Sequence, residues 1–272
     1  MWILKTKSLF YYSNKMTKRI ILTAVACFLS FVFWFKAKPW IVDPLRFQDV
    51  NVWLWPVIIL IAYTALLALS FLLLPKLYRL VAVVFNLGIF LIFFGVQEIV
   101  LAGGAIALLI QLSAIRAVQN AGDNSLHFKF VPALKPGISR LLTGVFILVS
   151  FAYFLSPGVQ ASAQNKELPQ GIRKTIQIVV GNYIGENLEI QNPRLKAETN
   201  NYIIKQVTTF LQPYFKFLPP ILAFGLFLIL QGISVVFVWL AVLLAFIVFW
   251  IFKTQGLVKI DKKPKEADVL SF

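Results

Sequence analysis

Long apolar stretches alternate with short polar segments along almost the whole chain. The longest apolar stretch, residues 217–252, contains no charged residue. A helix needs about 20 consecutive apolar residues to cross a bilayer, whereas the helices of soluble cores contain shorter runs. Because several stretches of this chain reach or approach that length, the pattern predicts an all-α, polytopic membrane protein.

Residues 20–156 are predicted to form five membrane-spanning helices. The first, residues 20–35, follows a basic segment at residues 1–19, and the lysines after it argue against a cleaved signal peptide. An excess of lysine and arginine favours the cytoplasmic side of a membrane, so the N-terminus is expected there. The second predicted span is residues 53–74.

The next apolar stretch, residues 80–115, is too long for one span. As a single helix it would measure over ~50 Å, against a hydrocarbon core of about 30 Å. We expect it to fold back at residues 95–98, where a glycine and two polar residues interrupt the apolar pattern. Residues 116–140 are then predicted to be a cytoplasmic loop, and residues 141–155 the fifth span.

Tryptophan residues surround the polar loop at residues 36–52. Indole rings prefer the headgroup layer, so this loop is expected to lie at a membrane interface. The residues concerned are Trp34, Trp40, Trp53 and Trp55.

Residues 157–216 contain the longest polar region and are predicted to hold two amphipathic helices, because apolar residues recur there at helical spacing. Residues 185–201 separate the two helices, and Pro193 is expected to break the helical pattern. Five spans counted from a cytoplasmic N-terminus place this segment outside the cytoplasm, on the membrane surface or against the bundle. The apolar positions are Ile172, Ile176, Val179, Val180 and Tyr183, followed by Ile203, Val207, Phe210, Leu211 and Tyr214.

Two rules disagree about residues 217–252. Their length as one helix, roughly 54 Å, favours two short spans with a turn at Gln231 and Gly232, and therefore seven spans in all. The basic tail, residues 253–272, would then lie outside the cytoplasm, although its lysines favour the inside. We prefer the hairpin, since basic residues only bias orientation. Six spans are the alternative.

The composition agrees with a membrane protein, and the distribution of charge argues against a nucleic-acid partner. Charged residues make up 14% of the chain, well below the roughly 25% of soluble domains. The net charge of +15 comes from lysines and arginines in the polar segments, where cytoplasmic excess and anionic lipids explain it. No nucleic-acid partner is therefore expected. The single cysteine, Cys27, excludes an intrachain disulfide and a thiolate metal cluster.

Glu98 is the strongest candidate for chemistry inside the membrane. It is the only acidic residue within an apolar stretch, and an intramembrane carboxylate often marks a proton or cation site. Together with Asn86 and Gln111 it forms a candidate intramembrane polar site, which Gln231 could also join. The alternative is that Glu98 faces water at a helical turn and that the amides only hold helices together. Close helix packing is predicted at Gly103, Gly104, Gly144 and Gly225.

No catalytic motif is present: the chain has no HExxH, GxSxG, P-loop or dinucleotide-binding glycine pattern. The only histidine, His127, is expected to be solvated in a loop, and no metal or other cofactor is expected. We therefore predict a multi-pass protein of the cell membrane without catalytic chemistry. It would act as a scaffold or as a subunit of a membrane complex, with the bilayer and other membrane proteins as partners. The alternative is a small transporter or channel that uses Glu98.

Overall fold

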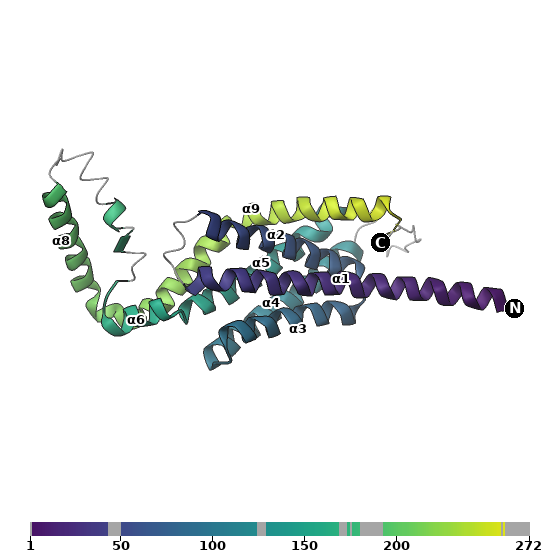
Figure 1. Cartoon of the computed structure of the whole chain (residues 1–272), viewed down its shortest axis with the longest axis horizontal. Coiled ribbons are helices and arrows are strands. Elements are labelled where there is room, and N and C mark those ends of the chain that lie inside the picture. Colours follow the sequence, from purple (N-terminus) through teal and green to yellow (C-terminus); the bar gives the residue numbers. More distant parts are fainter. Residues whose placement is uncertain are drawn as a thin grey trace, which may run out of the picture.

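The computed structural model describes residues 2–42, 50–123, 129–168, 173–174, 176–179, 193–256 and 258. Every long element in these residues is a helix (Figure 1). The helices are α1 (Trp2–Val42), α2 (Val50–Leu73), α3 (Lys76–Phe94), α4 (Glu98–Asp123), α5 (Phe130–Phe154), α6 (Pro157–Asn165), α8 (Pro193–Leu211), the 3-10 helix η2 (Gln212–Phe217) and α9 (Leu218–Thr254).

Within the described part of the chain, six helical segments are long and apolar enough to cross a membrane. The first five correspond to the predicted spans, and the sixth contains α9. The chain therefore has the build of a multi-pass helical membrane protein, while the predicted count of seven spans is not confirmed. The segments are Arg19–Val42, Val52–Leu73, Lys76–Phe94, Glu98–Ala121, Phe130–Phe154 and Glu198–Thr254.

The predicted fold-back at residues 95–98 is confirmed. Helix α3 ends at Phe94 and α4 begins at Glu98. Gly95 caps α3 with a φ of 85°, a conformation that glycine adopts at little cost, and its N–H donates to the carbonyl of Leu91 at 2.8 Å. The glycine therefore ends the helix where the length of the apolar stretch requires a turn.

The predicted loop at residues 116–140 is wrong over most of its length. Helix α4 continues to Asp123, and α5 already begins at Phe130. Pro132 lies in the first turn of α5, where a helix needs no N–H donor, while Pro136 is accommodated inside the helix. A helix satisfies its own backbone groups in water as well as in lipid, so it does not have to stop where the apolar residues stop.

The predicted hairpin turn at Gln231 and Gly232 is also wrong, because both residues lie within the continuous helix α9. Its 37 residues correspond to about 55 Å, more than one hydrocarbon core. The excess length does not require a second span, since Leu218 and Leu222 at the start of α9 pack with Leu168 and Phe215 in a small separate cluster.

Helix α5 lies in the centre of the bundle and packs against α1, α2, α4 and α9. Its contact with α4 depends on small residues. A side chain at Gly103 would overlap the ring of Phe151, and one at Gly137 would overlap Val118. Close packing is thus confirmed at Gly103. Gly225 was predicted to do the same, but a side chain there would meet no atom within 4 Å among the described residues.

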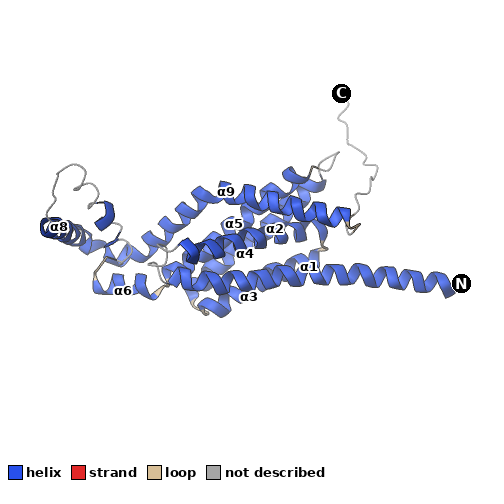
Figure 2. Cartoon of the chain, turned by 45° about the horizontal axis from the view of Figure 1, so that its top comes forward, coloured by secondary structure: helices blue, strands red, loops and turns tan. Residues whose placement is uncertain are grey.

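Helices α6 and α8 lie beyond one end of the bundle, and α8 runs crosswise to the bundle helices (Figures 1 and 2). The start of α1 and the end of α9 lie at the opposite end (Figure 1). Pro193 begins α8 and does not break it, as expected for proline in a first helical turn. Of the apolar positions predicted here, Val207 and Leu211 pack against the small cluster, whereas Phe210 and Tyr214 are exposed.

Candidate functional site

A group of hydrogen-bonded polar side chains lies in the interior of the bundle. The Oδ1 atom of Asn86 on α3 accepts hydrogen bonds from the Ser30 hydroxyl at 2.8 Å and from the Trp34 indole N–H at 2.9 Å. Its Nδ2 atom donates to Oε1 of Gln111 on α4 at 3.4 Å. All four side chains are buried. We call Ser30, Trp34, Asn86 and Gln111 the Asn86 cluster; it joins α1, α3 and α4.

Aromatic rings and a glycine fix the positions of these groups. The Trp34 ring lies 4.9 Å from that of Phe90 and 5.8 Å from that of Phe94, measured between ring centroids. Gln111 packs directly over Gly144, where an added Cβ would lie 2.9 Å from its Cγ atom. The small residue on α5 therefore makes the space in which the Gln111 side chain reaches the cluster.

The Asn86 cluster is neutral. Its amide, indole and hydroxyl groups can donate and accept hydrogen bonds, but none of them changes its charge near neutral pH. One group of the cluster and one beside it have unused hydrogen-bonding capacity among the described residues. Gln111 Nε2 has no partner, and the Tyr63 hydroxyl on α2 lies close to Ser30 without a hydrogen bond of regular geometry. The arrangement suits polar contacts better than proton transfer.

Glu98 does not join the cluster. It is the first residue of α4 and is exposed at the turn after α3. On the same helix it lies 13 positions before Gln111, which is roughly 20 Å along the axis. Its carboxylate is favourably placed beside the positive end of the α4 dipole. Glu98 thus lies at the helical turn considered as the alternative from the sequence, and its contact with water stays a prediction.

The remaining polar candidates lie elsewhere. Gln231 accepts a hydrogen bond from the Thr143 hydroxyl at 3.2 Å and so connects α9 to α5. His127 lies outside the described residues. Within the described residues, no group of three or more histidine, cysteine or acidic side chains could hold a metal ion.

Sequence reasoning missed Ser30 and Trp34 as members of the cluster. Trp34 was assigned to the membrane interface with the other tryptophans, but it is fully buried in the core, whereas Trp55 is 60% exposed. Ser30 and Trp34 are four residues apart and therefore share one face of α1. That spacing within an apolar stretch was the available signal.

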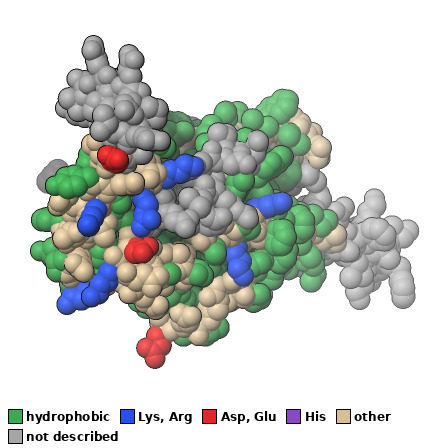
Figure 3. Space-filling view, turned by 60° about the vertical axis from the view of Figure 1, so that its left-hand side comes forward, with side chains coloured by type: hydrophobic (Ala, Val, Ile, Leu, Met, Phe, Trp, Pro, Cys, Tyr) green, Lys and Arg blue, Asp and Glu red, His purple; other side chains and the backbone are tan. Residues whose placement is uncertain are grey.

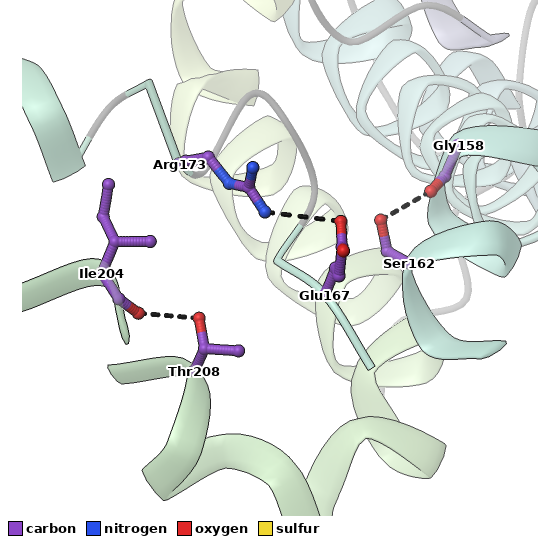
Figure 4. A network of polar contacts seen from close by, with 6 residues as sticks. All are labelled: Gly158, Ser162, Glu167, Arg173, Ile204 and Thr208. Carbon is purple, nitrogen blue, oxygen red and sulfur yellow. Dashed lines mark hydrogen bonds and ion pairs between the residues drawn. The ribbon is translucent and has the colours of Figure 1, made fainter. Parts of the chain in front are cut away.

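A second candidate surface lies on the segment beyond the bundle. Figure 4 shows part of its internal contacts: Arg173 pairs with Glu167 at 3.5 Å, and the Thr208 hydroxyl donates to the Ile204 carbonyl at 2.7 Å. Large aromatic side chains nevertheless remain exposed along α8, η2 and the residue before α9. We call them the external face: Tyr202, Phe210, Tyr214 and Phe217.

The chain matches no family model, and neither a curated protein sequence nor a solved structure resembles it at a significant level. Its own residues therefore carry the functional argument.

The external face combines apolar area with positive charge. Phe210 is 75% exposed, and Lys216 holds its ammonium group 4.8 Å from the centre of the Phe217 ring. Lys205 is also exposed on α8. Figure 3 looks onto this end of the molecule and shows Lys and Arg side chains scattered among hydrophobic surface. Exposed aromatic side chains are enriched at surfaces that bind other proteins.

Proposed function

We propose that the protein is a non-catalytic subunit or scaffold of a membrane complex, and that its external face contacts the partner. The observation that carries the proposal is the set of four exposed aromatic side chains on helices outside the bundle. Large aromatic side chains contribute much of the binding energy at protein interfaces. Several large apolar side chains exposed together on a protein surface commonly mark an interaction site.

The Asn86 cluster supports a structural role for the bundle interior. It contains no carboxylate, histidine, cysteine or lysine that could act as a nucleophile or general base. Its hydrogen bonds connect three helices, as polar residues commonly do in membrane bundles. We therefore favour an assembly function over an enzymatic one.

A small transporter or channel is the second candidate. Buried polar groups with unused hydrogen-bonding capacity, Gln111 Nε2 and the Tyr63 hydroxyl, favour it. The position of Glu98 weakens it, because the one carboxylate that could couple transport to protons is exposed at a turn. Transport would have to use neutral groups alone.

The proposal is tested by purifying the protein from its native membranes in mild detergent. We expect the wild-type chain to retain a partner protein in fixed stoichiometry. The Tyr202→Ser, Phe210→Ser double variant should retain at least about tenfold less of this partner, as expected when interface hot spots are removed. The Gln206→Ala, Thr209→Ala double variant changes exposed polar positions of the same helix and should retain the partner. Purification of the wild type alone contradicts the proposal. So does a proton-coupled flux in reconstituted vesicles that Glu98→Gln abolishes.

We further propose six spans with both termini in the cytoplasm. The end of the bundle where α1 starts and α9 ends is rich in cations, and Asp123 is its one acidic residue among those described. We call it the basic end. Positive charge favours the cytoplasmic side, which places α6 and α8 outside. The basic residues are Lys18, Arg19, Lys76, Arg79, Arg116, Lys129, Lys135, Arg140 and Lys253.

A topology reporter distinguishes six spans from seven. A reporter that is active only in the cytoplasm, fused after Phe272, is expected to be active. A cysteine at Asn165, in a Cys27→Ser background, should react with a membrane-impermeant maleimide in intact cells, because Asn165 is exposed at the end of α6. An inactive reporter with normal protein levels would contradict a cytoplasmic C-terminus.

A further inference from the structure

Lys135 on α5 and Trp239 on α9 form an exposed pair. The Lys135 ammonium group lies 4.6 Å from the centre of the Trp239 ring, and both side chains are exposed. The two helices pack closely on either side of the pair: Thr143 bonds Gln231, and the rings of Phe130 and Phe249 lie 4.8 Å apart. The pair is therefore held in place by the surrounding helix contacts.

Among the described residues, Lys135 has no carboxylate partner, and its ammonium group lies over the face of the Trp239 ring. Two arginines at the basic end behave differently. Arg140 donates to the carbonyl of Ser113 at 2.9 Å, and Arg79 donates to the carbonyl of Leu74. Lys135 thus presents a cation at the surface of the bundle.

The surface next to the pair is suited to hydrocarbon. Along α9, the residues one turn either side of Trp239 are large, apolar and exposed, and they form a continuous strip. A tryptophan and a lysine beside such a strip have the chemistry that recognises a phospholipid: a cation for the phosphate, an indole for the glycerol region and an apolar surface for the acyl chains. The strip consists of Val235, Val236, Leu240 and Leu243.

We propose that Lys135 and Trp239 form a binding site for one anionic phospholipid in the leaflet at the basic end, with the acyl chains along the α9 strip. Free phosphate fits less well, because it would leave the strip uncovered. The site is independent of the proposed assembly function, since the external face lies at the other end of the molecule.

The test measures lipid binding to the purified full-length protein in detergent. Short-chain phosphatidylglycerol, phosphatidylcholine and inorganic phosphate are each titrated, and the change in tryptophan fluorescence is followed. We expect phosphatidylglycerol to bind at least about fivefold more tightly than phosphatidylcholine, the effect of one lysine near an anionic headgroup. Lys135→Gln should remove this preference, Lys135→Arg should keep it, and Trp239→Leu should weaken binding and remove most of the fluorescence signal.

Lys166→Gln is the matched control, because Lys166 is exposed at the opposite end. It should leave the preference unchanged. The proposal is overturned if the wild type binds the two lipids equally, or if Lys166→Gln reduces the preference as much as Lys135→Gln does. Binding of inorganic phosphate as tightly as phosphatidylglycerol would identify a simple anion site and also overturn it. A lipid-release experiment with native mass spectrometry provides a readout that does not depend on Trp239.

Discussion

Replacing Asn86 by leucine should lower the free energy of unfolding by about 2 kcal/mol. The substitution conserves size but removes the acceptor of the Ser30 and Trp34 hydrogen bonds and the donor to Gln111. The Ser30 hydroxyl can turn to a carbonyl of its own helix, whereas the Trp34 indole N–H cannot. Most of the cost therefore comes from leaving that buried N–H without a partner. Denaturant unfolding in detergent micelles measures the effect.

Asn120→Leu is the control for this substitution, because Asn120 is exposed near the end of α4. It should change stability by less than about 0.5 kcal/mol. A further comparison, Trp34→Phe in the Asn86→Leu background, should recover part of the loss, since it removes the unpaired N–H while keeping an aromatic ring. Equal stability of the Asn86→Leu and Asn120→Leu variants would show that the Asn86 cluster does not stabilise the bundle.

Replacing Gly103 by alanine should destabilise the protein by about 1–3 kcal/mol, as overpacking of a well-filled contact does. The added methyl group would overlap the Phe151 ring, so α4 and α5 would have to separate or the ring would have to move. Elsewhere in a helix the same change is favourable, because alanine has the higher helix propensity. The sign of the effect therefore reports the close approach of the two helices.

Gly232→Ala in α9 provides the contrast, since a side chain at Gly232 would meet no described atom within 4 Å. It should be neutral or stabilise the protein by up to about 1 kcal/mol. Phe151→Leu combined with Gly103→Ala should be less destabilising than the sum of the two single changes. If Gly103→Ala proves as well tolerated as Gly232→Ala, α4 and α5 do not pack at this distance.

The sequence predicted the spans well where a local residue ends a helix. Gly95 ended α3 where expected, because glycine adopts its positive φ of 85° at little cost. Gln231 and Gly232 looked equally suitable for a turn, yet both lie inside α9. Neither residue forces a helix to end, and contacts distant in the sequence, such as Thr143 with Gln231, determine the outcome. Length alone could not predict that the start of α9 packs against η2 and the residues after α6.

The candidate polar site was predicted in part. Asn86 and Gln111 are polar residues in apolar stretches, and that alone was enough to bring them together as candidates. Glu98 differs because its position depends on where the turn falls, and the fold-back at residues 95–98 exposes it. Trp34 was misplaced because tryptophan is common both at interfaces and in cores, and composition does not separate the two cases. Whether the cluster has any role beyond packing stays a prediction.

Helix α9 is continuous from Leu218 to Thr254, so one helix connects the turn that packs on η2 with the turn that carries Lys253. Its side contacts with α5 lie between these ends, at Gln231, Trp239 and Phe249. The same helix therefore links the small cluster beyond one end of the bundle to the basic end, so a displacement of η2 acts directly on a helix that also packs against α5.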